Sequence, residues 1–425
     1  MENAIADRDR SVVKPLLVIA ILFFVFGFVT WLGSVLIPYL RIACELSNLS
    51  SYLIAFSFYI SYFVLALPAA ALLKKTGFKN GISLGLLIMA FGALLFVPAA
   101  LTRQFPLFLL GQFIQGAGIS LLQSAANPYV TILGPPASAA RRMSVMGICS
   151  GIAGILAPLV LGSVILENAD EVKAAVEALQ GHEKNIALDQ LAHRVIAPYI
   201  IMAVVLLLLA GFSHFSRLPE VNEDPGDEIG SAETGKKTSI WQFPHLWLGV
   251  LSIFVYVGTE VISVDSVVNY SHFQGYSLSA GKYFSSGTLF MMLVGYLVGL
   301  ICIPRLISQQ KALQVSALLG LSLVSSALFT SGTVSVLLIT LLGLANSLMW
   351  PAIWPLAIAD LGKFTKTGTS LLIMAIGGGA LLPLLFGYLT DKLNNQQAYL
   401  LLLPCYFIIW FFAKWGYLIR VRSKS

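Results

Sequence analysis

The chain has 425 residues, of which 57% are hydrophobic and only 11% are charged, and its formal net charge is +6. This composition is too apolar for a soluble domain of that length, so it excludes a soluble enzyme and predicts an integral membrane protein. The positive charge lies mainly in alternate loops between apolar runs, as the topology of a membrane protein requires. It therefore gives no indication of a nucleic-acid partner.

Long apolar runs alternate with short polar breaks and predict an all-α protein with twelve transmembrane helices of about 20 residues each. The first run is too long for a cleavable signal sequence and is expected to stay in the membrane. The predicted spans cover residues 15–40, 50–73, 81–101, 104–133, 143–166, 195–217, 244–271, 283–304, 311–331, 333–360, 369–389 and 398–419.

The distribution of Lys and Arg predicts the orientation of these spans. If both termini are cytoplasmic, the loops after the even-numbered spans and both tails lie inside, and they carry most of the basic residues, such as Lys74, Lys75, Arg141 and Arg142. This is the asymmetry expected from the positive-inside rule, so it supports both the span count and the orientation.

The first two spans carry polar or aromatic side chains that are candidates for a substrate site. Span one contains Trp31 and Ser34, and span two contains Tyr59. These side chains either line a central cavity or pack between helices, and the sequence alone leaves both alternatives open for Tyr59 in particular.

Span four carries Gln115, Gln123 and Asn127, which recur at multiples of four residues and therefore share one helix face. An amide offers both a donor and an acceptor, which suits the adjacent hydroxyls of a sugar ring. The alternative is that these amides bond neighbouring helices together, a common use of Gln and Asn in membranes. Cavity lining is favoured for Gln123.

Two polar segments interrupt the pattern of spans. Residues 167–194 are predicted to form an amphipathic outer loop with a surface helix. Residues 218–240, rich in Glu, Asp, Gly and Ser, are predicted to be a flexible inner linker between six spans and six. The expected organisation is a first half at 1–217, a cytoplasmic linker at 218–243 and a second half at 244–425.

The two halves show an internal repeat. A shift of 227 residues places Gly116 of span four on Gly343 of span ten, and a shift of 225 places Pro158 of span five on Pro383 of span eleven. Two neighbouring spans that repeat in the same order predict two parallel, pseudo-symmetric six-helix halves, an organisation frequent in transporters.

Span seven carries two acids, Glu260 and Asp265, within an apolar run. Each ionised carboxylate costs about 2.5 to 3.5 kcal/mol in hydrocarbon, so it is expected to face protein or a wet cavity. A structural ion pair is disfavoured because no Lys or Arg is predicted at mid-depth, so these acids need water, a cation or a proton. They lie on different helix faces, Asp265 shares its face with Asn269, and a weak repeat sets Asp265 opposite Ser34.

Span ten presents Asn346 and Trp350 one turn apart. The indole of Trp350 is expected to stack on the apolar face of a sugar ring, whereas a tryptophan at the headgroup belt is the alternative explanation.

Four long motifs give the chain a family resemblance. They are LIPYL after span one, QSAANPYVTILGPP in span four, YVGTEV in span seven, and LGKFTKTGTSLLIMAIGGGALLPLLFGYLTD around span eleven. With them the chain resembles the fucose, galactose and glucose cation symporters of the major facilitator superfamily. MGIC in span five and WPAIWPLAI in span ten are most similar to bacterial N-acetylglucosamine permeases. The resemblance implies sugar uptake across a bacterial inner membrane by alternating access.

The chain departs from the family pattern at two positions. Fucose symporters carry an Asp where this chain has Ser34 and a Glu where it has Gln123, and both acids are implicated in proton coupling there. Coupling is therefore expected to lie in the other half, at Asp265 with Glu260. Plain hexose transporters carry a larger side chain where this chain has Ser150, which suggests room for an N-acetyl group.

The resulting hypothesis is cation-coupled uptake of a hexose or N-acetylhexosamine such as N-acetylglucosamine, glucose or galactose. The coupling ion is a proton or Na⁺, and Asp265, Glu260 and Asn269 would hold Na⁺; no other metal or cofactor is expected. A sugar uniporter or a transporter-like sensor without coupling is the alternative. A membrane enzyme is not expected because an HExxH motif is lacking and the histidines lie in loops or near span ends. The expected partners are the sugar and the bilayer, with the chain as a monomer.

Overall fold

The computed structural model describes residues 18–132, 139–216, 239–303, 306–361 and 364–420, and every regular element among them is a helix. Residues 18–30 are helical. The α-helices that follow are α2 (Gly33–Ala43), α3 (Asn48–Leu94), α4 (Phe96–Thr102), α5 (Phe105–Ile132), α6 (Ala139–Ile165), α7 (Ala169–Ala178), α8 (Gly181–His193), α9 (Ile196–Phe215), α10 (Pro244–Asp265), α11 (Val267–Phe273), α12 (Leu278–Cys302), α13 (Gln309–Phe329), α14 (Gly332–Thr340), α15 (Leu342–Ser347), α16 (Met349–Ile358), α17 (Thr365–Met374), α18 (Gly378–Lys392) and α19 (Leu402–Lys414). Short 3₁₀ turns η2 (Ile240–Gln242), η4 (Ala375–Gly377), η5 (Gln397–Leu401) and η6 (Gly416–Arg420) complete them.

The described residues contain twelve helical segments that are long and apolar enough to span a membrane, which confirms the predicted span count. They cover Val18–Ala43, Asn48–Leu65, Lys75–Thr102, Phe105–Ala126, Val145–Ile165, Gly181–Phe215, Pro244–Asp265, Leu278–Cys302, Gln309–Phe329, Gly332–Ile358, Ser370–Lys392 and Gln397–Ile419. The sixth segment is longer than expected because α8 leads directly into α9. The outer loop 167–194 thus forms two helices, and most of the predicted linker lies outside the described residues.

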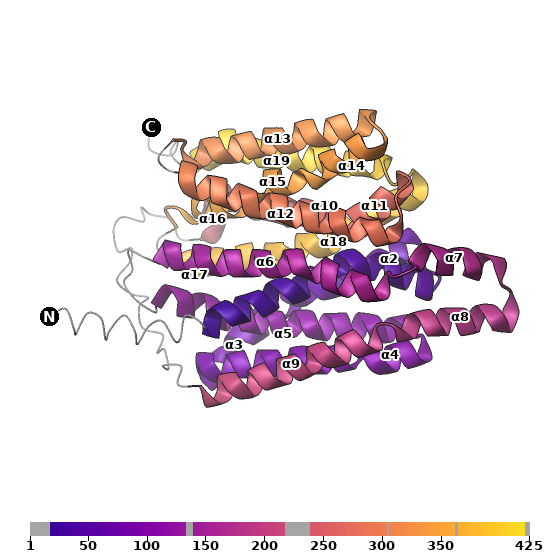
Figure 1. The fold of residues 1–425 in the computed structure, drawn as a ribbon. Coiled ribbons are helices and arrows are strands. Elements are labelled where there is room, and N and C mark those ends of the chain that lie inside the picture. The colour runs from indigo at the N-terminus through magenta and orange to yellow at the C-terminus, as the bar shows by residue number, and fades with distance from the viewer. Residues whose placement is uncertain (1–17, 133–138, 217–238, 304–305, 362–363, 421–425) are drawn as a thin grey trace.

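The helices form two bundles that lie side by side, one built from residues up to α9 and the other from α10 onward (Figure 1). α7, α8 and α11 lie at one end of the molecule, here named the α7–α8 end, and α16 and α17 lie toward the opposite end. The bundles meet where α18 packs on α3 and α12 packs on α6; Ser286 of α12, for example, donates a hydrogen bond to the carbonyl oxygen of Ile155 at 2.9 Å.

The glycines of the internal repeat occupy equivalent positions in the two halves. A Cβ atom at Gly116 would overlap the carbonyl oxygen of Phe58 in span two, and one at Gly343 would overlap the carbonyl oxygen of Thr288 in span eight. Because only glycine permits this close approach between helices, both halves use the same contact. The sequence repeat therefore reflects a repeated packing arrangement.

The helices of spans seven and eleven are each interrupted. In span seven, α10 ends at Asp265 and α11 begins at Val267, with Ser266 between them. In span eleven, the 3₁₀ turn η4 separates α17 from α18 at the triple glycine that begins at Gly377.

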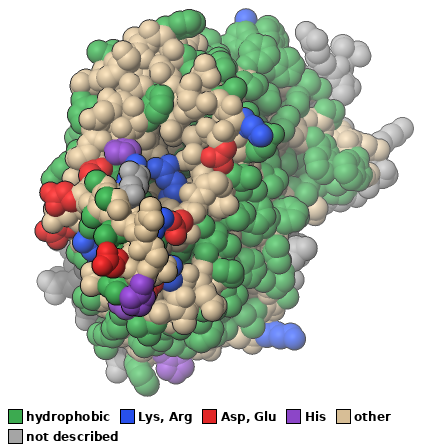
Figure 2. Space-filling view, turned by 90° about the vertical axis from the view of Figure 1, so that its right-hand side faces the viewer, with side chains coloured by type: hydrophobic (Ala, Val, Ile, Leu, Met, Phe, Trp, Pro, Cys, Tyr) green, Lys and Arg blue, Asp and Glu red, His purple; other side chains and the backbone are tan. Residues whose placement is uncertain are grey.

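The surface has the polarity that a membrane setting requires. Large apolar side chains such as Leu208, Phe215 and Phe329 are exposed on the flanks. Figure 2 looks onto the α7–α8 end, where acidic, basic and histidine side chains gather, whereas the neighbouring flanks are mostly hydrophobic. This end is therefore suited to water, and the flanks are suited to lipid.

Candidate functional site

The carboxyl group of Asp265 lies buried where the two halves meet. Asp265 is the last residue of α10 and is 2% exposed. A Cβ atom at Gly33 of α2 would lie only 2.8 Å from its Oδ2, so the carboxyl group rests against the backbone of span one. Its Oδ1 has no hydrogen-bond partner among the described residues. Gly33 has no side chain and so leaves room for this carboxyl group, which a larger residue at position 33 would displace.

The neighbours of Asp265 include two polar residues predicted from the sequence. Ser34 follows Gly33, and its hydroxyl donates a hydrogen bond of 3.1 Å to the carbonyl oxygen of Trp31 within span one, not to the acid. Asn269, four residues beyond Asp265, is 3% exposed, and neither its Nδ2 nor its Oδ1 has a described partner. Span seven thus presents an acid and an amide that are both buried and short of hydrogen bonds.

Two tyrosines of α3 complete this side of the site. Tyr52 and Tyr59 both lie near Asp265, and Tyr59 lies near Glu260 as well. A Cβ atom at Gly379 of α18 would lie 3.0 Å from the ring of Tyr59, which also stacks beside Tyr62. The predicted residue Tyr59 is therefore placed between the two acids at the junction of the halves.

Glu260 occupies a different, aromatic environment. Its Oε1 accepts a hydrogen bond of 2.7 Å from the hydroxyl of Tyr256, one turn earlier in α10. Tyr256 lies 6.3 Å from Trp350, measured between ring centroids, and Trp350 lies 5.1 Å from Trp354. Glu260 is only half-buried. The predicted acid and the predicted tryptophan are thus brought to one region of the second half, with Tyr256 joining them.

No described Lys, Arg or His lies within ion-pair distance of Asp265 or Glu260. Ion pairs among the described residues, such as Arg103 with Asp189 and Lys184 with Glu45, lie elsewhere. The described residues also contain no group of three or more His, Cys, Asp and Glu side chains suited to a metal ion. A charge on either acid is therefore not balanced by a neighbouring basic side chain in this part of the chain.

Asn346 is built into a hydrogen-bonded network. It is 0% exposed, its Nδ2 donates to Ser263 Oγ at 3.1 Å, and its Oδ1 accepts from the hydroxyl of Tyr406 at 2.9 Å. The network joins α10, α15 and α19. In this arrangement the amide links three helices of the second half.

Trp31 and Ser150 lie where spans one and five pack. The indole of Trp31 packs against Gly154 of α6 and against a small cluster that includes Val264. The backbone of Ser150 lies directly against Gly27, and its Oγ would be 2.6 Å from a Cβ atom there. Trp31 is therefore near the interface of the halves, whereas Ser150 faces span one.

The amides of span four are not brought together with the acids by any described contact. Gln115 is 1% exposed and packs its Cγ against Gly92 of α3, with neither side-chain nitrogen nor oxygen bonded to a described residue. Gln123 is half-buried. Asn127 lies in α5, but its side chain is outside the described residues.

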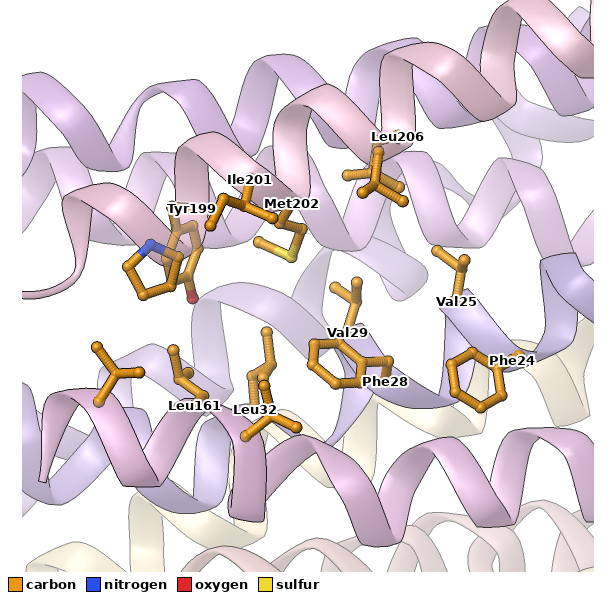
Figure 3. A pocket seen from close by; sticks show the side chains of 14 residues that line it. Phe24, Val25, Phe28, Val29, Leu32, Leu161, Tyr199, Ile201, Met202 and Leu206 are labelled. Carbon is orange, nitrogen blue, oxygen red and sulfur yellow. The ribbon is translucent and has the colours of Figure 1, made fainter.

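A cavity of about 350 Å³ lies elsewhere, between the first span, α6 and α9. Its lining is almost wholly apolar, with Phe28, Leu161 and Met202 among the side chains that face it (Figure 3). A sugar needs hydrogen-bonding partners that this lining lacks, so the cavity is not the polar site.

Sequence reasoning missed two tyrosines that shape the site, Tyr256 and Tyr406. The four-residue spacing of Tyr256 and Glu260 is a signal that points to their contact, because residues one helical turn apart face the same way. Tyr406 gives no such signal, since its partner Asn346 is 60 residues away.

The arrangement suits reversible binding of a cation next to a polar ligand. An unbalanced buried carboxylate favours a proton or a bound cation, because burial disfavours its charged form. An amide, tyrosines and a tryptophan nearby offer hydrogen bonds and an apolar platform of the kind that a sugar uses.

Comparison with known proteins gives consistent matches. The profile of the Major Facilitator Superfamily matches residues 19–381. The glucose/galactose transporter of Brucella abortus biovar 1 (strain 9-941) is 36% identical over 405 residues, which cover 94% of this chain and 93% of that protein. The L-fucose-proton symporter of Escherichia coli (strain K12) is 30% identical over 430 residues, 99% of this chain and 95% of that one.

Solved structures match equally well. The crystal structure of FucP, a Major Facilitator Superfamily transporter, in the outward conformation superposes with a TM-score of 0.70 at 29% identity and covers 98% of this chain and 100% of that one. The matches agree with the two-half architecture. The chain therefore belongs to the Major Facilitator Superfamily and is a transporter, not an enzyme.

Proposed function

We propose that this protein is a cation-coupled sugar symporter that takes up a hexose across the bacterial inner membrane by alternating access. The names of its relatives, glucose/galactose transporter and L-fucose-proton symporter, support a sugar as substrate and a proton as coupling ion. The observation that carries the proposal is Asp265, a buried carboxylate with an unbonded oxygen, held by the second half against the backbone of the first.

In the proposed cycle the sugar binds between the halves, which rock around it. An ionised Asp265 is costly to enclose, so the halves close over the site when a cation has neutralised it. Occupancy by the sugar and by the cation are then linked, since each favours the same state. One inward positive charge at about 150 mV supplies roughly 3.5 kcal/mol, enough for a few-hundred-fold accumulation.

The orientation follows from the basic residues: both termini are cytoplasmic, and the α7–α8 end faces outward. Na⁺ is the competing coupling ion, because Asp265, Glu260 and Asn269 carry the oxygen ligands that hard cations prefer. N-acetylglucosamine is the competing substrate, supported by the motif resemblance alone, because Ser150 packs against Gly27 of span one. The protein acts as a monomer in this proposal.

The direct test is transport in proteoliposomes. Uptake of labelled glucose, galactose, fucose and N-acetylglucosamine is measured under an imposed inward proton gradient, an imposed inward Na⁺ gradient, and neither. We expect the proton gradient to drive accumulation of glucose or galactose. Accumulation driven by the Na⁺ gradient instead would show that Na⁺ is the coupling ion. Equilibration of the sugar without accumulation under every gradient would reject symport and leave facilitated diffusion.

A further inference from the structure

Two aspartates at the α7–α8 end each bond to the opposite half of the molecule. Asp391 lies at the end of α18 in the second half. Its Oδ2 accepts a hydrogen bond of 2.8 Å from the backbone N–H of Leu49, and its Oδ1 accepts bonds from Asn48, at 3.1 Å from the backbone and 2.8 Å from Nδ2. Asn48 and Leu49 are the first two residues of α3 in the first half.

Asp170 makes the reciprocal contact. It lies in the first turn of α7 in the first half, and its Oδ2 accepts a hydrogen bond of 2.8 Å from the backbone N–H of Leu278. Leu278 is the first residue of α12 in the second half. The Oδ1 of Asp170 lies 3.5 Å from Nδ1 of His272, also in the second half.

The two contacts resemble each other, although the two aspartates do not occupy matched positions of the internal repeat. α3 and α12 begin spans two and eight, and each starts after a serine N-cap: Ser47 accepts from the N–H of Ser50, and Ser277 accepts from the N–H of Ala280. Asp170 lies in α7, shortly after span five, and Asp391 lies at the end of span eleven, in α18. In each half, therefore, an acid near the end of the fifth span of that half binds the start of the second span of the other half.

The chemistry favours an acid at these positions. The first N–H groups of a helix have no partner within the helix, and the helix dipole makes this end positive. A carboxylate that accepts these bonds is stabilised, and the bonds are stronger than neutral ones. Both acids obtain them only while the halves are together at this end.

We propose that Asp170 and Asp391 form a pair of latches that hold the α7–α8 end closed during one stage of the transport cycle, and that both must release for this end to open. The inference rests on the proposed alternating access, and it identifies the contacts that set the balance between closed and open states. With the proposed orientation, these latches close the outer side.

The experiment measures the opening directly. Spin labels are placed at two exposed positions of this end, Glu183→Cys in the first half and Gln397→Cys in the second, after the four native cysteines are replaced by alanine. Distances between the labels are measured by double electron–electron resonance in lipid nanodiscs. No sugar or ion gradient is needed, so a failure of sugar transport would leave this measurement interpretable.

Asp391→Ala and Asp170→Ala are each expected to raise the ratio of long to short distances by on the order of 5- to 30-fold, with a larger rise when they are combined. Asp391→Asn keeps an acceptor oxygen and is expected to show a smaller rise. The matched control is Asp189→Ala, because its partner Arg103 belongs to the same half. Unchanged distances in both single alanine variants, or an equal change in the control, would overturn the proposal.

Discussion

At the scale of single residues, the proposed coupling chemistry depends on Asp265 and its surroundings. The acid is enclosed by Gly33 of the other half, and no described basic residue balances its charge. Its energy therefore depends strongly on whether a proton or another cation is bound. An exposed acid would not couple ion binding to the closure of the halves in this way.

Asp265→Asn is expected to abolish uphill accumulation while leaving sugar exchange intact. The amide resembles the neutral acid in shape, so the halves can close without an ion and the sugar still crosses the membrane. Accumulation under a proton gradient and counterflow without a gradient are measured in the same proteoliposomes. Undiminished accumulation would remove Asp265 from the coupling mechanism.

A variant at Asn346 distinguishes between two roles of its amide, packing of the second half and binding of the sugar. Asn346→Ala leaves the buried Tyr406 hydroxyl without this acceptor, which costs about 1 to 3 kcal/mol, whereas Ser263 keeps its hydrogen bond to the carbonyl oxygen of Glu260. We expect a lower thermal unfolding temperature for the sugar-free protein in detergent. An unchanged unfolding temperature together with weaker sugar binding would instead assign Asn346 to the substrate site.

At the scale of helices, repeated glycines set how closely neighbouring spans approach. Gly116 and Gly343 place spans four and ten directly against backbone carbonyl groups of spans two and eight. Helix association in a membrane depends on such close packing, because lipid provides no hydrophobic force between helices.

Gly343→Ala and Gly116→Ala are each expected to destabilise the protein by about 1 to 3 kcal/mol, because the added methyl group forces the helices apart. Thermal unfolding in detergent measures the effect. Gly147→Ala is the control: no atom lies within 4 Å of the added Cβ, so we expect no loss of stability. Equal losses at Gly147 and Gly343 would contradict the packing explanation.

At the scale of the whole molecule, ion binding and sugar binding act on the same equilibrium between the halves. If the coupling ion is a proton, linkage requires that sugar affinity rise as pH falls, because a larger fraction of the protein is then loaded with the proton. The same reciprocity requires the sugar to promote proton uptake. A uniporter would show neither effect.

Sugar binding by the purified protein is expected to strengthen at lower pH and to lose this dependence in Asp265→Asn. A sugar at 100 times its Kd stabilises the protein by about 2.7 kcal/mol, so a thermal-shift screen of hexoses, deoxyhexoses and N-acetylhexosamines at several pH values measures both selectivity and linkage. A pH-independent affinity in the unaltered protein, with a response to Na⁺, would favour sodium coupling.

The sequence by itself determined the features that depend on composition along the chain. The twelve spans follow from apolar length, since a helix must satisfy its own backbone in lipid. The parallel halves follow from the aligned pairs Gly116 with Gly343 and Pro158 with Pro383. A separate and weaker match of spans one and seven sets Asp265 opposite Ser34, and the structure places Asp265 against the neighbouring Gly33.

Only the tertiary structure decided which polar groups meet. Gln115 and Gln123 share a helix face, yet Gln115 packs against Gly92 of a neighbouring helix, and the partner of Asn346 lies on span twelve. In the sequence, Asp170 and Asp391 resemble ordinary acids of the loops between spans. Their contacts with the opposite half become visible only once the two bundles are docked. Side-chain partners depend on helix rotation and docking, which a pattern along one chain does not specify.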